Sequence, residues 1–131
     1  MFRQYIPSKR HKYGVKIVCA TSGYVWNALV YSGKSDPIPD LGHSERVVMK
    51  TMEKQLDGGH ILFVDNFYTT LPLSQELLKR KTLLCGTLRQ NRKHLPEAVM
   101  SAKLKSGQHV ARRNGRTVVR KRRDKRDVMM L

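Results

Sequence analysis

The stretch HILFVDNFYTT, from His60 to Thr70, constrains the fold more than any other part of the sequence. Its apolar run is typical of a short strand that is buried on both faces of an α/β sheet. The run ends at a carboxylate, Asp65, and Thr69 or Thr70 is then expected to cap a helix over residues 71–81. A strand that leads through a few polar residues into a helix predicts an α/β fold.

The segments on either side continue this alternation. Upstream, residues 15–21 and 24–33 surround a Ser-Gly turn and are rich in β-branched and aromatic residues, which predicts a β-hairpin. Ser44 is expected to cap a helix that the pair Gly58-Gly59 ends. The predicted order is β-hairpin, helix, strand, helix and strand. This order predicts a mainly parallel sheet with the antiparallel hairpin at one side.

The composition becomes more basic after these elements. We therefore divide the chain into an α/β part, residues 1–95, and the start of a basic, β-rich extension, residues 96–131. Within the extension, Asn114-Gly115 is the strongest short-range signal for a hairpin, and residues 127–131 are typical of a further strand. Residues 1–14 are expected to form an extended arm.

The charge of the chain is high and uneven. The 131 residues carry 26 Lys and Arg against 10 Asp and Glu, a net charge of +16. Residues 1–78 hold 9 basic and 7 acidic residues, a net of +2, whereas residues 79–131 hold 17 and 3, a net of +14. Such an excess implies a polyanionic partner, of which nucleic acid is the commonest. A membrane surface or mere solubility are the alternatives.

The sequence argues against several classes of site and compartment. Cys19 and Cys85 stand far apart and the five histidines are scattered, which disfavours a zinc site or a disulfide framework and fits a reducing compartment. No window of apolar residues is long enough to predict a membrane span. The basic N-terminus lacks the apolar segment of a secretory signal.

Asp65 is the acid with the most informative position. At the carboxyl end of a strand in an open α/β sheet, a side chain lies where ligands collect, and a carboxylate there suits Mg²⁺ or Mn²⁺. Two such ions could activate a nucleophile and stabilise a leaving oxygen in phosphoryl transfer, but one aspartate cannot hold both. Alternatively, Asp65 caps the turn into the following helix through backbone N–H groups. The spacing leaves both readings open.

The other acids do not complete a site by their pattern. Asp124 and Asp127 are expected to neutralise their basic neighbours. The run RKRRDKR, residues 120–126, is similar to a nuclear-localisation patch, with a solvated or a DNA-facing strand edge as the alternative. The hairpin tip RRNGR could bind phosphates without reading sequence. The acids expected to be solvated or paired with Lys and Arg are Asp36, Asp40, Glu45, Glu53 and Asp57.

Five segments, in this order, resemble the piggyBac family of DDE transposases, including its domesticated, transposase-derived members. They are FRQYIPSKRHKYGVKI, GYVWNALVYSGK, HILFVDNFYTTLPLSQELLKRK, CGTLRQNRKHLP and RRNGRTVVRKRRDKRDVMML. The third is the most recognisable, with an aspartate followed by Asn, an aromatic residue, Tyr or Phe, and Thr. Arg122 departs from the family, which usually carries an aromatic residue at this position.

The resemblance implies a partial RNase H-like core followed by a basic, β-rich extension. Asp65 matches the family's second catalytic aspartate, a ligand of Mg²⁺ (or Mn²⁺). The family's first aspartate lies on a central strand upstream of Met1, and its third lies beyond Leu131. The chain is therefore expected to be an internal fragment of the catalytic domain that lacks its first central strand and does not catalyse alone.

The resemblance also implies partners and a location. The complete protein is expected to cleave and join DNA at transposon ends and target, in the nucleus, and to form a homodimer. A domesticated, non-catalytic DNA-binding protein is the alternative. The residues expected to bind DNA are basic and follow the last predicted strand of the α/β part: Arg89, Arg92, Lys93, Arg112, Arg113, Arg116, Arg120, Lys121, Arg122 and Arg123.

Overall fold

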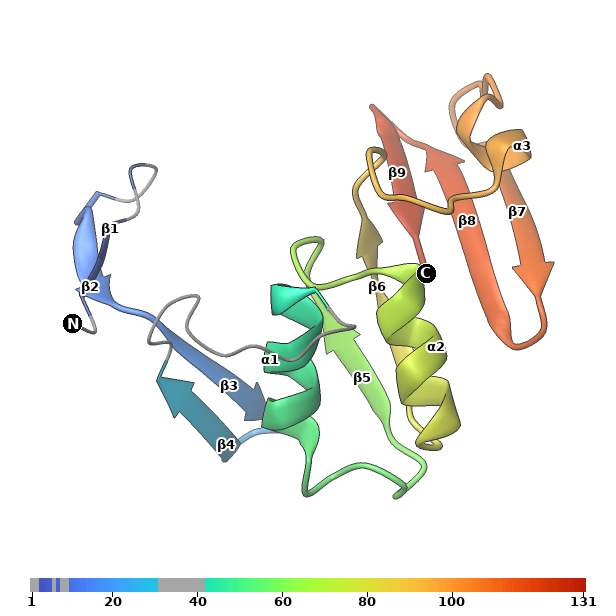
Figure 1. The fold of residues 1–131 in the computed structure, drawn as a ribbon. Coiled ribbons are helices and arrows are strands. Elements are labelled where there is room, and N and C mark those ends of the chain that lie inside the picture. Colours follow the sequence, from blue (N-terminus) through green and yellow to red (C-terminus); the bar gives the residue numbers. More distant parts are fainter. Residues whose placement is uncertain (1–2, 6, 8–9, 31–41) are drawn as a thin grey trace. The chain divides into compact units, whose positions relative to one another are not determined.

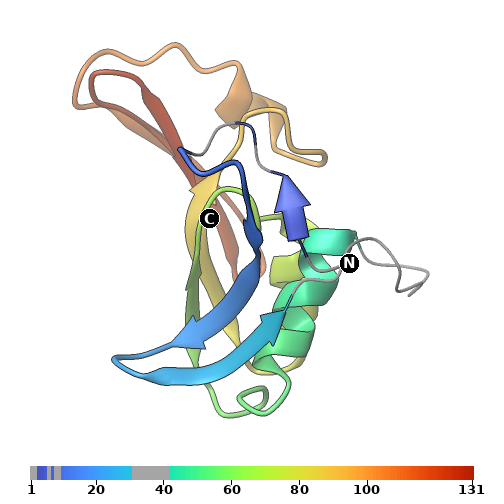
Figure 2. The ribbon, with the colours of Figure 1, turned by 90° about the vertical axis from the view of Figure 1, so that its left-hand side faces the viewer.

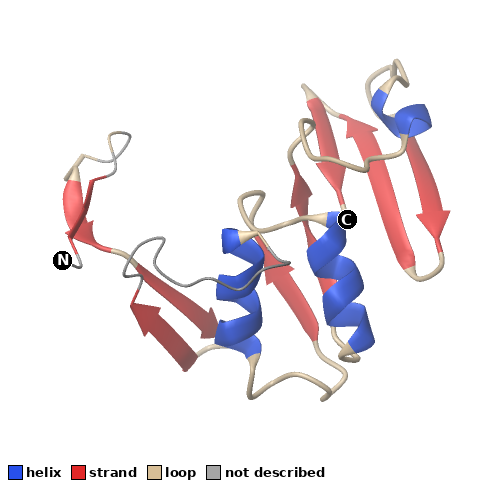
Figure 3. Ribbon diagram, in the orientation of Figure 1, coloured by secondary structure: helices blue, strands red, loops and turns tan. Residues whose placement is uncertain are grey.

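The computed structural model describes residues 3–5, 7, 10–30 and 42–131. The chain contains both helices and strands, and the two alternate in its middle part, which confirms the expected α/β class (Figures 1 and 3). The chain forms two compact units, Met1–Lys54 and Gln55–Leu131. The domain boundary after residue 95 stays a prediction.

The first unit contains two antiparallel strand pairs and a helix. β3 and β4 form a two-stranded sheet of their own, and the turn between them contains Gly23 with a φ of 92°, which glycine adopts without strain. This confirms the predicted hairpin. The expected N-terminal arm instead contains a short strand pair, with Tyr5 opposite Tyr13, because three-residue strands leave no clear alternation in the sequence. The elements are β1 Arg3–Tyr5, β2 Tyr13–Val15, β3 Ile17–Thr21, β4 Val25–Val30 and α1 His43–Met52.

Helix α1 packs beside the β3–β4 hairpin (Figures 1 and 2). Val48 and Met52 are buried, and the Nδ2 of Asn27 on β4 donates to the carbonyl of Thr51 at 2.9 Å. A side chain of the hairpin therefore satisfies a backbone carbonyl near the end of the helix.

The boundaries of α1 differ from those predicted. The helix follows Gly42, so the expectation that Ser44 is the N-cap is wrong. Glu45 takes part in the capping instead, because its Oε2 accepts the N–H of Gly42 at 2.8 Å. The helix ends at Met52, before the predicted stop at Gly58-Gly59, and turns fill the interval.

The second unit is built on a five-stranded mixed sheet with the order β5–β6–β9–β8–β7 (Figure 1). β5 and β6 are parallel, and the other neighbours are antiparallel. The prediction of a mainly parallel sheet is therefore wrong, because the basic extension returns β9 to pair with β6. The elements are β5 Ile61–Val64, α2 Leu71–Lys79, β6 Leu83–Leu88, α3 Glu97–Met100, β7 His109–Asn114, β8 Thr117–Arg123 and β9 Asp127–Met130.

The β7–β8 hairpin and the strand β9 confirm two predictions from sequence. Asn114 pairs with Thr117 across a two-residue turn, whose first residue, Gly115, has a φ of 58°. This left-handed conformation explains the glycine at that position.

Helix α2 begins where the sequence predicts. The Oγ1 of Thr70 accepts the N–H of Leu73 at 3.2 Å, and Pro72 occupies the first turn. Leu73 and Leu77 are fully buried. Full burial of a leucine side chain contributes about 1.5–3 kcal/mol, so these two residues anchor the helix.

A second apolar cluster lies under β7, β8 and β9. Leu88, Val99, Val119 and Met129 are its buried members, and they come from β6, α3, β8 and β9 respectively. The register explains the cluster, because Leu88 lies opposite Met129 and Met129 lies opposite Lys121 on the same face of the sheet.

Strand β5 is not buried on both faces, so this prediction is wrong. Phe63 is 73% exposed and Ile61 is 56% exposed, because β5 is an edge strand and one face of it is open. The aromatic side chains of Tyr24 and Trp26, beside and on β4, are exposed as well.

Candidate functional site

Asp65 lies directly after β5, and a tight turn carries the chain from it into α2. Its Oδ1 accepts the N–H groups of Phe67 at 3.1 Å and of Tyr68 at 3.4 Å. The backbone carbonyl of Asp65 also accepts the hydroxyl of Thr69 at 2.8 Å. Among the described residues, Oδ2 has no hydrogen-bond partner, and the side chain is exposed. The capping role considered from sequence is therefore present, and it leaves one carboxylate oxygen open.

Two arginines that follow β6 hold this turn. Arg89 Nε donates to Asn66 Oδ1 at 3.1 Å, and its guanidinium lies 5.6 Å from the centroid of the Phe67 ring. Arg92 Nη2 donates to the carbonyl oxygens of Asn66 at 3.1 Å and of Phe67 at 2.5 Å. The parallel pairing of β5 with β6 places both carboxyl ends at one edge, so residues more than twenty positions apart meet.

The arginines of the β7–β8 hairpin lie at the surface. Arg112, Arg113 and Arg116 are exposed, and Arg113 Nε donates to the carbonyl of Gly115 at 2.6 Å. Lys93 is exposed as well. These positions are accessible to a ligand, and their contact with DNA stays a prediction.

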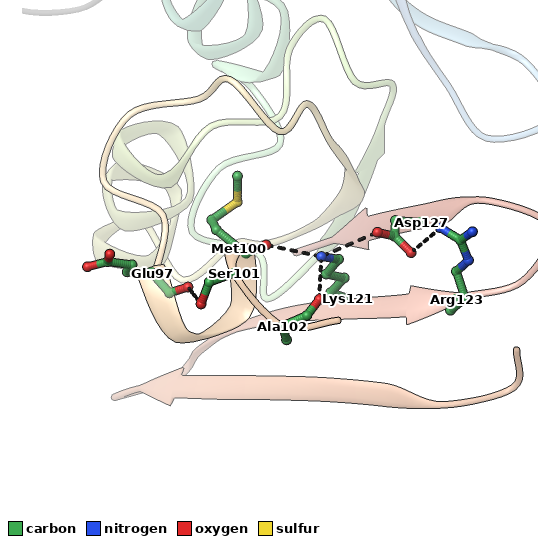
Figure 4. Close-up of polar contacts among 7 residues, drawn as sticks. All are labelled: Glu97, Met100, Ser101, Ala102, Lys121, Arg123 and Asp127. Carbon is green, nitrogen blue, oxygen red and sulfur yellow. Dashed lines mark hydrogen bonds and ion pairs between the residues drawn. The ribbon is translucent and has the colours of Figure 1, made fainter. Parts of the chain in front are cut away.

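Lys121 does not share this exposure. Its side chain is 7% exposed, and Nζ donates to the carbonyls of Met100 at 3.0 Å and of Ala102 at 2.8 Å (Figure 4). Nζ also lies 3.3 Å from Asp127 Oδ2, while Arg123 Nη1 lies 3.0 Å from Asp127 Oδ1. We therefore revise the expectation that Lys121 contacts DNA, because its ammonium group is used within the fold.

The Lys121–Asp127 cluster shifts the titration of its acid. The hydrogen bond from Arg123 holds the pKa of Asp127 below its usual range, burial opposes this shift, and Lys121 adds to it. The expectation that Asp127 neutralises basic neighbours is confirmed. Asp57 behaves in the same way, because the hydrogen bond from Arg80 lowers the pKa of its carboxyl.

All 131 residues match the sequence profile of a family described as Transposase IS4. The chain belongs to this family. The expected resemblance to the piggyBac family is confirmed by the fold, which matches a solved structure described as a cryo-EM structure of the piggyBac transposase synaptic complex with hairpin DNA. That match has a TM-score of 0.89 and 27% sequence identity. It covers 98% of this chain and 29% of the other, so the chain spans less than a third of that transposase.

Among the residues that the structure describes, Asp65 is the candidate metal ligand. Within residues 3–5, 7, 10–30 and 42–131, no group of three or more His, Cys, Asp or Glu side chains is placed to hold a metal ion. Asp65 offers one exposed, hard oxygen donor, which fits one position in the shell of a Mg²⁺ ion that takes one or two protein carboxylates. These residues fit a contribution to a metal site and not a complete two-metal site. Asp36 and Asp40 lie outside the described residues.

Sequence reasoning missed the roles of Asn66, Arg89 and Arg92 in holding the Asp65 turn. The two arginines were expected to bind DNA. They are more than twenty residues from Asn66 in the sequence, so no local pattern indicates a contact between them. Only the pairing of β5 with β6 creates that contact. The asparagine in the motif after Asp65 was the one available signal.

An apolar cavity of about 340 Å³ in the second unit does not add to the site. Its lining includes Phe63, Leu83 and Val118, and Asp65 is not part of it.

In the part of the chain that the structure describes, no helix is long and apolar enough to cross a bilayer.

Proposed function

We propose that the chain is part of the RNase H-like catalytic domain of a piggyBac-like DNA transposase, and that Asp65 is one of its metal-binding carboxylates. The observation that carries this proposal is the open Oδ2 of Asp65 at the carboxyl edge of β5, in a chain that matches a transposase family over its whole length. When bound, Mg²⁺ (or Mn²⁺) would activate a nucleophile and stabilise the leaving oxygen of a phosphodiester.

The residues around Asp65 prepare it for this role. The N–H groups of Phe67 and Tyr68 fix Oδ1, which sets the direction of Oδ2. Arg89 and Arg92 hold the turn from the neighbouring strand, so the carboxylate needs little ordering when a ligand arrives. Such preorganisation is the main contribution that protein groups make to phosphoryl transfer.

DNA is the proposed partner. Residues 79–131 carry a net charge of +14, and the solved transposase that the chain resembles is described in complex with hairpin DNA. The complete enzyme would cleave and join DNA strands in the nucleus, as a homodimer. This chain, whose described residues place one carboxylate at the site, binds DNA and does not cleave it.

Binding of the 131-residue chain to a labelled DNA duplex over a series of salt concentrations tests this proposal. We expect clear binding at low salt and a steep, linear loss of log affinity with log salt, because phosphate contacts release counterions. Binding that is undetectable at low salt, or that does not weaken with salt, would overturn the proposed partner.

A non-catalytic, domesticated DNA-binding protein is the second candidate, favoured by the single carboxylate that the described residues place at the site. The variant Asp65→Asn discriminates the two. If Mn²⁺ changes the DNA affinity of the unmodified chain but not of the variant, the metal acts through Asp65. Equal affinities and an equal effect of Mn²⁺ in both proteins would favour the second candidate.

A further inference from the structure

The register of β7 and β8 sorts the basic residues of the extension onto two faces. Arg113 lies opposite Val118, and Arg120 lies opposite Ala111, so Arg113, Arg120 and Arg122 share one face of the sheet. We call these three arginines the basic face. The run of basic residues in β8 thus has alternating directions, which its composition alone does not show.

The opposite face of the same strands packs on the interior. Val119 and Lys121 are buried there, against the core that includes Val99 of α3. Arg123 shares this second face and is paired with Asp127. Lys121 and Arg123 are therefore committed to the fold, whereas Arg112, opposite Val119 on the same face, is exposed and donates only to the carbonyl of Ala111.

The cations of the basic face are not committed in this way. Among the described residues, Arg120 and Arg122 are exposed and have no hydrogen bond or ion pair within the chain, and Arg113 bonds only its own turn. Among the described residues, apolar side chains of this face also reach the solvent, since Val118 is 42% exposed and Met130 is 38% exposed. None of the residues that share this face by register is acidic: Ile61, Phe63, Leu83, Cys85, Thr87, His109, Ala111, Arg113, Val118, Arg120, Arg122, Val128 and Met130.

We propose that the basic face binds the phosphate backbone of duplex DNA without reading base sequence; this rests on the proposed function and locates its DNA contact. Arg120 and Arg122 are two residues apart on one strand, so their Cα atoms are about 7 Å apart, and Arg113 lies diagonally across on β7. Guanidinium groups bind phosphate oxygens in a bidentate manner. Contacts to phosphates position a protein on DNA and carry no direct sequence information.

The test compares two variants of the 131-residue chain that lose the same charge. The first is R113Q/R120Q/R122Q, which removes the three positive charges of the basic face. The control is K81Q/K103Q/K105Q, which removes three exposed cations of the same unit that do not belong to that face and were not predicted to bind DNA. Circular dichroism and thermal unfolding confirm that both are folded, and binding to a labelled duplex is measured across a salt series.

We expect the first variant to bind duplex DNA about tenfold more weakly or worse at low salt, and its slope of log affinity against log salt to shrink by about 2.7, one step of about 0.9 for each lost phosphate contact. The control variant should change the slope by less than one such step. The charge-preserving variant R113K/R120K/R122K should keep most of the affinity. Two duplexes of unrelated sequence should respond alike.

Each failure has a distinct meaning. If the unmodified chain does not bind duplex DNA, the proposed function fails together with this inference. If the chain binds DNA but the control variant loses as much affinity as the first, DNA binding stands and the basic face is overturned as its location. Binding to phosphatidylserine vesicles that depends on the three arginines, with no such dependence for DNA, would also overturn the proposal in favour of a membrane surface.

Discussion

Two clusters in the second unit combine a carboxylate with basic side chains, and they use the acid differently. At the Asp65 turn, one oxygen accepts two backbone N–H groups and the other stays open, while Arg89 and Arg92 bind the surrounding backbone and Asn66. In the Lys121–Asp127 cluster, both oxygens of Asp127 are paired with cations, and Lys121 is buried.

The difference teaches that residue type does not separate a binding site from a structural cluster. Both clusters contain one aspartate and two basic residues. What separates them is whether the cations neutralise the acid or hold the turn that presents it. A carboxylate with both oxygens in ion pairs cannot bind a metal ion without breaking them. Backbone N–H donors, in contrast, orient a carboxylate without adding a positive charge.

The largest expected effect comes from breaking the structural cluster. Lys121→Ala should lower the free energy of unfolding by about 3 kcal/mol, because it leaves Asp127 without one partner and two carbonyls without a donor. Urea denaturation measures the change. Arg122→Ala, an exposed neighbour in the same strand, should change the same quantity by less than about 0.5 kcal/mol. Equal losses in both variants would refute the structural role of Lys121.

Replacing Arg92, one of the two arginines that hold the Asp65 turn, should have a smaller effect. Arg92→Ala should cost about 1.5 kcal/mol, since a half-buried, charge-assisted bond to two carbonyls is lost. Hydrogen exchange should show faster exchange of the amides of Phe67 and Tyr68, while the amides of β7 and β8 stay protected. Uniform acceleration over the unit would mean that Arg92 does not act on the turn.

Acid should release the structural cluster. Because pairing lowers the pKa of folded Asp127 below the unfolded value near 3.8, its stabilising contribution is full above that value and is lost as the pH falls through the folded pKa. The difference in free energy of unfolding between the unmodified chain and Asp127→Asn should therefore be constant near neutral pH and shrink below about pH 4. A difference that does not depend on pH would contradict the assignment.

The smallest effect on stability is expected at the candidate site itself. In Asp65→Asn, the amide oxygen can still accept the N–H groups of Phe67 and Tyr68, so the free energy of unfolding should change by less than about 0.5 kcal/mol. Asp65→Ala removes that acceptor and should cost about 1 kcal/mol. A large loss in Asp65→Asn would show that the charge of Asp65 serves the fold.

Local signals in the sequence predicted much of the fold. The Thr70 cap, the glycine-dependent turn at Gly115 and the strand Ile61–Val64 before Asp65 depend on neighbouring residues, and all three lie where they are expected. Two wrong predictions are local, namely the cap at Ser44 and the helix end at Gly58-Gly59, and the wrong prediction of the sheet concerns pairing over long distances. Nothing local indicates that β9 joins β6, which makes most of the sheet antiparallel.

The same limit applies to the site. The strand end and the motif predict Asp65 as a site residue, but exposure and pairing decide which basic residues are available for a ligand. Arg120 and Lys121 are adjacent in one basic run, and the two-residue repeat of the strand exposes the first and buries the second. Composition cannot separate them without the register.

The most direct test of the central claim is a Mn²⁺ titration of the ¹⁵N-labelled chain followed by NMR. If Asp65 is a metal ligand, the amide signals of Asn66, Phe67 and Tyr68 should broaden first in the unmodified chain. This broadening should be lost in Asp65→Asn and kept in Asp124→Asn, which removes another exposed acid. Broadening that is the same in all three proteins, or that is strongest away from the Asp65 turn, would contradict the claim.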